Sequence, residues 1–416
     1  LFRIENGLTI DGQWIPGMYY FYLNYCRIHD KVKKLDSFPN FWDLDADYFS
    51  KLDESMKAKQ HFAIFKKRQS GFSFKGGVPI VYNLHRYPGS MNYLMSFLEA
   101  HADKTWSFVK NYLNHINQYT AFYKNRDPDS NSFIKMSYKE FDEYGRKLER
   151  GYKSELHKVA FKDSAEKGVG GAITLAVLEE SGVWPNILEV LEFIKPATQA
   201  GTETTGQIII YGSVGDIDKS KGLKTIFYSP EDHNFWSTKN FWSMNEDKGK
   251  NTAYFVPEFM CMNPHIDSCG NSDIEASLVS INKERTREKR KSPKLFSFYI
   301  SQHPLYPEEG FLSRNSNKFP VDLCMQWKSK LLSQDKLKFA GFGAKLFLID
   351  GKVTQKLLPE FDTPLTVWPV DLRKLQADFG GLAEGVCWIY QPPEDNAPES
   401  MYIASTDSVD QNLEGA

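Results

Sequence analysis

Short apolar runs that end in polar residues or glycine recur along the first half of the chain. The clearest are "HFAIF" (61–65), "ITLAVLEE" (173–180) and "GQIIIYGS" (206–213). Uninterrupted runs of this kind predict strands buried on both faces, as in a parallel sheet covered by helices. The segment "NILEVLEFIKPATQA" (186–200) has the length of a helical crossover between the last two strands. We therefore expect an α/β fold with a mainly parallel central sheet.

Longer stretches show helical spacing. Residues 38–54 predict a turn followed by a helix with an acidic face, and 88–116 predict one helix that starts at the Pro-Gly-Ser signal. Residues 271–294 predict a helix with a basic last turn and a proline stop. "HKVAF" (157–161) indicates a further strand, and Asp-Gly within 344–358 predicts a hairpin turn at 350–351.

Composition narrows the class of protein. With 51 Lys and Arg against 53 Asp and Glu in 416 residues, the net charge is −2, so a nucleic-acid surface would have to be local. The sequence contains no run of 18 apolar residues, so we expect no membrane-spanning helix. Five scattered cysteines favour a reduced, intracellular protein.

Cys261, His265 and Cys269 lack a second ligand pair, which favours an ordinary loop over a zinc site. Because the chain begins at Leu1 without Met, we expect its true start to be missing.

The segment "KKRQSGFSFKGG" (66–77) lies where a strand turns into a helix. A phosphate loop has this position, because backbone N–H groups at a helix start surround phosphate oxygens while a lysine and a Ser or Thr hydroxyl serve the phosphates and Mg²⁺. Gly71 and Ser73 fit that pattern, but Phe72 replaces the usual lysine. Lys66, Lys67, Arg68 or Lys75 remain as sources of the charge. Taken alone, the segment equally suits a basic turn without a ligand.

Two downstream motifs change this balance. Glu179 and Glu180 end a buried strand, where one carboxylate can hold Mg²⁺ and the next can polarise an attacking water. Ser213, beside Gly212, ends a neighbouring strand and could sense the γ-phosphate. Each motif alone also suits an ordinary strand end. Their order and spacing together favour an ATPase.

The helix end "KERTREKRK" (283–291) allows two interpretations. Lys and Arg stabilise the negative end of a helix dipole, which makes a solvated helix terminus sufficient. Contact with the DNA backbone is the functional alternative.

Together these motifs resemble the large terminase subunit of tailed bacteriophages, the ATPase that drives DNA into a capsid. Residues 61–73 look like its deviant Walker A, 173–186 like its Walker B with the following glutamate, and 206–213 like its coupling motif. "FYLNYCRI" (21–28) resembles the aromatic segment near the adenine. "HPLYPEEGFL" (303–312) is similar to an element before the nuclease domain, and "MYIASTDSVDQ" (401–411) to the first strand of an RNase H-like nuclease.

The resemblance implies a role for each matching residue. Glu180 would orient the attacking water, Arg68 would stabilise transition-state charge, and Lys66 is the first choice for the phosphate lysine. Ser73 and Glu179 would hold Mg²⁺ with ATP. Gly212 and Ser213 would couple hydrolysis to movement, and Asp407, with Asp410 as a possible helper, would begin a nuclease metal site. The implied nucleotide-binding set is Lys66, Lys67, Gln69, Ser70, Gly71, Phe72, Ser73 and Lys75.

The sequence departs from the family pattern in two places, the Walker B acid and the helix that follows the loop. Glu179 stands where Asp is commoner, and Pro79 predicts a shortened helix after the loop. Arg146 and Arg150 are guesses for an arginine finger that acts on a neighbouring subunit.

The resemblance also implies a domain plan. It comprises a P-loop NTPase core of the ASCE or RecA-like type with an adenine-side segment (1–225), its completion with a lid or linker region and hairpin (226–395), and a truncated nuclease start (396–416). The second divalent metal site needs a complete nuclease domain, so we expect no DNA cleavage by this chain.

The implied activity is ATP-driven packaging of double-stranded DNA. The implied partners are the portal protein, the small terminase subunit and further copies in a ring, without a membrane, in the host cytoplasm and transiently on the procapsid. A helicase-like ATPase and a non-hydrolysing structural relative are the alternatives.

Overall fold

The computed structural model describes residues 1–10, 12–30, 34–162, 170–214, 217–243, 248–311, 342–349, 352–357 and 386–389. The chain divides into two compact units, Leu1–Val321 and Asp322–Ala416. Each unit is described by itself. The predicted boundaries at 225 and 395 stay predictions.

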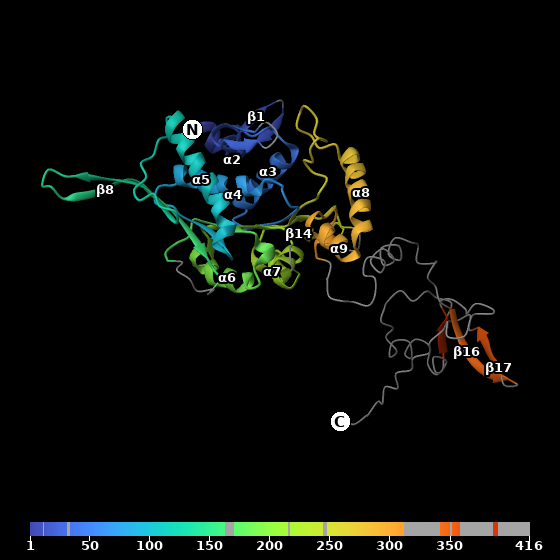
Figure 1. Cartoon of the computed structure of the whole chain (residues 1–416). Helices are drawn as coiled ribbons and strands as arrows, with labels where there is room; N and C mark the ends of the chain where they lie inside the picture. Colours follow the sequence, from blue (N-terminus) through green and yellow to red (C-terminus); the bar gives the residue numbers. More distant parts are fainter. Residues whose placement is uncertain are drawn as a thin grey trace, which may run out of the picture. The chain divides into compact units, whose positions relative to one another are not determined.

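A seven-stranded sheet is the centre of the first unit (Figure 1). Every neighbouring pair is parallel except β8 and β7, which are antiparallel. The predicted mainly parallel α/β sheet is thus confirmed. In spatial order the strands are β15 (Tyr254–Val256), β5 (Phe62–Lys66), β12 (Gln207–Gly212), β9 (Leu175–Glu179), β6 (Met91–Ser96), β8 (Lys147–Ala160) and β7 (Phe133–Phe141).

Helices cover both faces of this sheet. Alternate strand residues point to opposite faces, so Ile64, Val177 and Ile209 face one core, while Phe65 and Leu178 face the other. The first core is completed by α2 (Gly17–Tyr25), α3 (Asp43–Lys57), α4 (Phe72–Arg86) and α5 (Glu99–Tyr119), and the second by α6 (Ile187–Ile194) and α7 (Ile217–Tyr228). Burial on both faces explains why the strands read as uninterrupted apolar runs.

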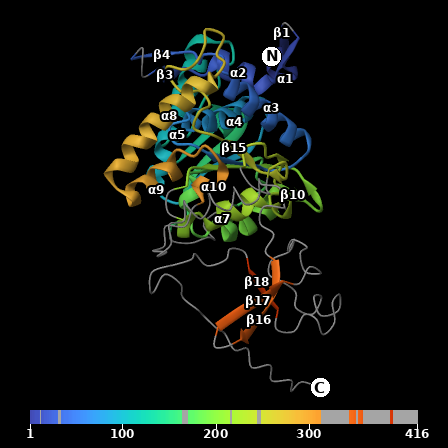
Figure 2. The same cartoon turned by 90° about the vertical axis from the view of Figure 1, so that its right-hand side faces the viewer.

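The other elements of the first unit are short, except for two packed helices. The helices α8 (Ile274–Lys291) and α9 (Pro293–Gln302) lie side by side, in gold in Figure 2. As predicted, α8 ends just before a proline; the side chain of Asp273 caps its start by accepting from the Ala276 N–H. The rest are α1 (Phe2–Asn6), β1 (Leu8–Ile10), β2 (Gln13–Ile15), β3 (Ile28–Asp30), β4 (Leu35–Ser37), η1 (Ser181–Val183), η2 (Lys195–Thr198), β10 (Gln199–Ala200), β11 (Glu203–Thr204), η3 (Glu231–His233), β13 (Thr238–Lys239), β14 (Asn251–Thr252) and α10 (Pro307–Gly310).

The single helix predicted over 88–116 is wrong in its first part. Residues 91–96 form β6, which pairs with β9 and β8 in the interior of the sheet, and the helix α5 starts at Glu99. The segment "MNYLMS" is apolar enough to suit a helix or a strand. It forms a strand because five of its six residues are buried between two neighbouring strands.

The shortening expected from Pro79 is also wrong. The helix α4 runs over 15 residues with Pro79 inside it. Proline cannot donate a hydrogen bond to the carbonyl of Lys75, which costs helix stability. Nearly the whole helix is buried against the sheet, α2 and α5, so packing outweighs this local cost.

The ribbon of β7 and β8 is longer than the predicted strand at 157–161. Figure 1 shows it extending away from the rest of the first unit. Its far end carries the exposed aromatic residues Tyr138, Phe141 and Tyr144. Arg146 and Arg150 lie in this part and pair with Asp142 and Glu140 of the ribbon itself.

In the second unit, β16 (Phe342–Ile349) pairs antiparallel with β17 (Lys352–Leu357) and with β18 (Val386–Ile389). Ile349 lies opposite Lys352; the predicted turn at 350–351 lies outside the described residues. The predicted nuclease strand at 401–411, with Asp407 and Asp410, lies outside the described residues. None of the helices that the structure describes is both long and apolar enough to cross a membrane.

Candidate functional site

The carboxyl ends of β5, β12 and β9 lie together at one edge of the sheet. Gly212 pairs with Phe65, and Tyr211 pairs with Glu179, so the three strands end in register. Residues 67–71 connect β5 to α4 at this edge. Open α/β sheets bind ligands outside the carboxyl ends of their strands, which makes this edge the candidate site.

The loop after β5 has the backbone of a tight turn into a helix. Gln69 (φ 57°) and Gly71 (φ 74°) are left-handed, and the Ser70 hydroxyl donates to the Lys67 carbonyl at 2.9 Å. Phe72 begins α4 and is only 1% exposed, with its ring against Tyr48 at 5.0 Å. The residue in the place of the lysine is therefore a core residue, whose ring packs on Tyr48 and Tyr211.

Lys66 lies beside the second of the two glutamates. Its Nζ is 3.0 Å from Glu180 Oε1, and the Lys66 side chain is 7% exposed. Burial alone would raise the pKa of Glu180, but the charge and hydrogen bond of Lys66 outweigh it and hold that pKa below its usual value. Ser213 Oγ lies 3.4 Å from the other carboxylate oxygen. The structure thus brings together Lys66, Glu180 and Ser213 from three strand ends.

Glu179 is buried next to this group. Its Oε1 accepts hydrogen bonds from the hydroxyls of Thr105 and Tyr211, and burial raises its pKa to about 7. The Thr105 hydroxyl also lies 3.2 Å from the Ser73 carbonyl, which connects Glu179 to the first turn of α4. Gly76 makes room for this arrangement, because a Cβ there would lie 2.0 Å from the Tyr211 hydroxyl.

Two other lysines of the loop region have protein partners. Lys67 donates to the carbonyls of Glu258 (2.8 Å) and Met260 (2.6 Å), and burial lowers its pKa. Lys75 forms an ion pair with Asp45 at 2.5 Å, in which both side chains are 2% exposed, and donates to the Ser70 carbonyl. Arg68 and Gln69 are exposed. Lys66 is therefore the lysine that the structure brings to the paired glutamates.

Gly212 allows the end of β12 to lie close to η1. A Cβ at Gly212 would lie 2.4 Å from the Gly182 nitrogen, and one at Gly182 would lie 2.1 Å from the Ser213 carbonyl oxygen. Only glycine at both positions permits this approach, which keeps Ser213 beside Glu180.

The segment 302–311 touches the loop and the end of β12. The Arg68 N–H donates to the Gln302 carbonyl at 3.1 Å, and the Gln302 side chain donates to the Val214 carbonyl. Further along, the Phe311 ring lies 4.7 Å from Phe65 of β5. Of the "HPLYPEEGFL" element (303–312), Phe311 thus lies against the strand that leads into the loop.

Some contributors were not predicted. Thr105 lies in the middle of α5, where no local signal marks it. Tyr211 lies in "IIIYGS" opposite Glu179, so the strand register would have identified it. Asp45 was included only as part of an acidic helix face, and its burial against Lys75 follows from tertiary packing.

The predicted adenine segment (21–28) is only partly buried. Phe21 and Tyr22 of α2 are 2% exposed, and their rings pack on Tyr82 and Phe49, while Tyr25 is half-buried. Its role beside a base stays a prediction.

Other predicted candidates have ordinary structural contacts. Cys261 Sγ lies 3.2 Å from Asp43, and His265 bonds Ser280 at 2.7 Å. In the part of the chain that the structure describes, no three His, Cys, Asp or Glu residues gather as a metal site would need. In the basic end of α8, Arg285 forms a bidentate pair with Glu309, and Lys291 pairs with Glu288.

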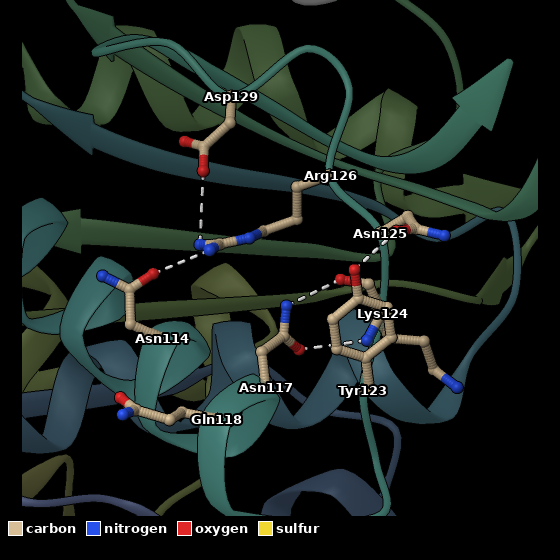
Figure 3. Close-up of a pocket in the computed structure, with 8 residues that line it drawn as sticks. All are labelled: Asn114, Asn117, Gln118, Tyr123, Lys124, Asn125, Arg126 and Asp129. Atoms are coloured by element: carbon tan, nitrogen blue, oxygen red, sulfur yellow. Dashed lines mark hydrogen bonds and ion pairs between the residues drawn. The ribbon is translucent and has the colours of Figure 1, made fainter.

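A hollow of about 410 Å³ lies at the end of α5 (Figure 3). Asn117 exchanges two hydrogen bonds with the backbone of Lys124, and Arg126 donates to Asn114 and pairs with Asp129. Asn114 follows Thr105 by nine residues, or about 14 Å along the helix axis. This hollow is therefore remote from the paired glutamates, and its polar groups bond largely to one another.

The chain therefore has an α/β fold with a mostly parallel sheet, helices on both faces and a strand–loop–helix junction beside paired glutamates. No protein-family model matches the chain, and no curated protein matches it.

Among solved structures, the chain is similar to the large terminase ATPase domain of Thermus phage P74-26. A mutant form gives 12% identity and a TM-score of 0.43 over 62% of this chain and 92% of that one. A second structure of the domain gives 12% and 0.40 over 60% and 88%. The large terminase of bacteriophage HK97 gives 11% and 0.43 over 68% and 53%. At these identities and TM-scores, function has to be argued from the residues of this chain.

Proposed function

We propose that this chain hydrolyses ATP and that the hydrolysis drives double-stranded viral DNA into a procapsid. The ion pair of Lys66 with Glu180, next to the buried Glu179, is the observation that supports it best. A cation beside two carboxylates at the carboxyl ends of parallel strands, directly after a strand–loop–helix junction, suits phosphoryl transfer better than a purely structural role.

The residues take the following roles in this proposal. Lys66 neutralises phosphate charge when it leaves Glu180, and the freed Glu180 carboxylate orients and polarises the attacking water. Backbone N–H groups from Gln69 to Ser73 contact phosphate oxygens at the start of α4. Arg68, exposed within the loop, stabilises charge in the transition state. Ser213 reports the state of Glu180 to β12.

The residues present fit a Mg²⁺ ion that arrives with ATP. Magnesium sites at phosphates use one or two protein oxygens and leave the remaining positions to phosphate and water. The Ser73 hydroxyl and the Glu179 carboxylate would supply the protein ligands; Thr105 ties these two residues together. When bound, the ion would neutralise charge on the phosphates. Glu179 must be ionised to bind it, although burial raises its pKa to about 7.

The proposal extends to partners. As a packaging ATPase, the chain would act as a ring of copies at the portal, with the small terminase subunit and double-stranded DNA, while docked on a procapsid in the host cytoplasm. Arg146 and Arg150 lie on the projecting ribbon, where a neighbouring subunit could meet them. Asp407 and a second metal site belong to a nuclease domain that needs further carboxylates.

One observation favours a second candidate, a structural relative that no longer hydrolyses ATP. Phe72 is a buried core residue in the place of the usual lysine. The turnover of ATP by wild type and by Glu180→Gln separates the two. The packaging ATPase requires turnover that Glu180→Gln lowers by at least a hundredfold, while ATP still binds. Equal background phosphate release from both proteins would favour the structural relative. DNA unwinding by wild type would favour a helicase-like ATPase.

A further inference from the structure

A histidine at the start of α5 lies near the paired glutamates. The strand β6 ends at Ser96, and α5 begins at Glu99 with His101 in its first turn. Ser96 pairs with Glu179 of β9, so α5 starts at the edge of the sheet that forms the candidate site. The fold therefore brings an imidazole to this edge, although none of the motifs at the strand ends contains it.

The helical spacing of α5 shows on which flank of the helix His101 lies. Glu99 and Asp103 both pair with Lys158 of β8, at 3.0 and 2.6 Å. His101 is two residues from each of them, or about 200° around the helix axis, and so lies on the opposite flank. Since β8 and β9 lie on opposite sides of β6, the flank with His101 is the one towards β9.

The contact of Thr105 with β9 agrees with this placement. Thr105 follows His101 by four residues and therefore lies on the same flank, about 6 Å further along the helix axis. Its hydroxyl donates to Glu179. His101 lies one turn nearer the start of the helix, and Glu180 lies one residue beyond the end of the strand. The flank that contacts the first glutamate thus leads to the second.

The charge of a protonated His101 also reaches Glu180. Burial raises the pKa of Glu180, and Lys66 is the main group that lowers it again. The Ser213 backbone and then His101 lower this pKa further. The imidazole and the Glu180 carboxylate are therefore near enough to interact.

The imidazole of His101 also has a nitrogen without a partner. Its Nδ1 is buried, and no residue that the structure describes is hydrogen-bonded to it. Buried polar atoms in proteins are nearly always bonded, since each unmade bond costs the desolvation of the atom. The Glu180 carboxylate could accept from Nδ1–H, but its two oxygens are bonded to Lys66 and Ser213. Separation of Lys66 from Glu180 would release an acceptor near this nitrogen.

We propose that His101 is a positioning residue for Glu180. When Lys66 leaves Glu180 for the phosphates, the Nδ1–H of His101 donates to the carboxylate in its place, and Ser213 keeps the other oxygen. The carboxylate then keeps one orientation towards the attacking water. The inference rests on the proposed ATPase function and adds to it a residue outside the motifs that suggested it.

Steady-state ATP turnover by the whole chain tests this role. His101→Leu should lower kcat about ten- to a hundredfold, the size of one hydrogen bond to a charged group, and change KM for ATP less than about twofold. A rise in KM at unchanged kcat would overturn the inference, because His101 would then act on ATP binding. His115→Leu is the matched control on the same helix, about 21 Å further along the axis. The His115 ring packs on Phe38 and Tyr119, and its loss should change neither constant.

His101→Asn separates hydrogen bonding from packing. The Asn side chain resembles Leu in size, and its amide N–H reaches about the position of Nδ1, so kcat should stay within about threefold of wild type. Equal losses in His101→Asn and His101→Leu would mean that packing alone matters and would overturn the inference. Urea unfolding of both variants shows whether they fold equally well.

A double variant tests whether His101 acts through Glu180. Added to Glu180→Gln, His101→Leu should lower turnover less than about twofold further, because the carboxylate that it positions is already gone. A further loss as large as in wild type would overturn the inference. Turnover by His101→Leu equal to wild type would overturn it as well and leave the ATPase proposal standing. Absence of turnover by wild type would overturn both.

Discussion

Lys66 and Glu180, 114 positions apart in the chain, lie 3.0 Å apart at the ends of β5 and β9. The pair joins the residue proposed to grip phosphate with the residue proposed to orient water. In this ion pair each side chain neutralises the charge of the other. In the proposed mechanism, ATP binding breaks the pair, and the same event frees the Glu180 carboxylate to orient the attacking water.

The first prediction concerns this pair. Lys66→Met should lower ATP affinity at least tenfold, because a buried cation is lost where phosphate charge arrives. It should also raise the pKa of Glu180, since the largest effect that opposes burial is then removed. Isothermal titration with ATP measures the affinity, and carboxyl NMR measures the pKa. Unchanged affinity would exclude Lys66 as the phosphate lysine.

Lys67 provides a contrast. Lys67→Met should lower the free energy of unfolding by about 3 kcal/mol, because two partly buried carbonyls lose a charged donor. Its effect on ATP affinity should be smaller than that of Lys66→Met. Urea denaturation and the same titration measure both quantities. A large loss of affinity at unchanged stability would show that Lys67 binds the nucleotide.

The buried pair of Lys75 and Asp45 should act as a unit. Removal of either partner should cost about 3–5 kcal/mol, since the other charge remains buried and unpaired. Lys75→Met combined with Asp45→Ala should cost clearly less than the sum of the single changes. A double-mutant cycle in urea measures this coupling, and strict additivity would refute it.

Gly76 should matter through Tyr211. Gly76→Ala places a Cβ 2.0 Å from the Tyr211 hydroxyl and should displace that hydroxyl from Glu179. We expect lower stability and, if the chain is an ATPase, a turnover that needs more Mg²⁺. Gly77→Ala is the matched control in the same helix turn, where the nearest atom would be a Val109 methyl at 3.1 Å. Similar results for both variants would contradict the proposed link.

His61 should make stability depend on pH. Burial, and then Lys195, lower its pKa to about 4, and its Nδ1 accepts from the Ile208 N–H. Between pH 6.5 and 4 the unfolded chain binds a proton that the folded chain does not, so this contribution to stability is lost as pH falls. The loss amounts to roughly 3 kcal/mol. In thermal or urea unfolding across this range, His61→Asn should show a weaker pH dependence; an identical profile would exclude His61 as the cause.

Much of the site was predictable because it lies at strand ends. Continuous apolar runs marked β5, β9 and β12, and parallel strands bring the residues that follow them to one edge. Phe72 was harder to interpret, because its burial against Tyr48 depends on a helix 15 or more residues upstream. "MNYLMS" and the antiparallel ribbon were missed for the same kind of reason. The strands that pair with these segments are distant in the sequence, so the local spacing of apolar residues does not predict the pairing.

Gln302 has a mechanical consequence. Its carbonyl is bonded to the loop at Arg68, and its side chain is bonded to the end of β12 at Val214. A displacement of the loop must therefore either move Gln302 or break one of these hydrogen bonds. For the same reason, a force that pulls on residues 303–311 would act on the loop through Gln302, and a movement of the loop would act on residues 303–311.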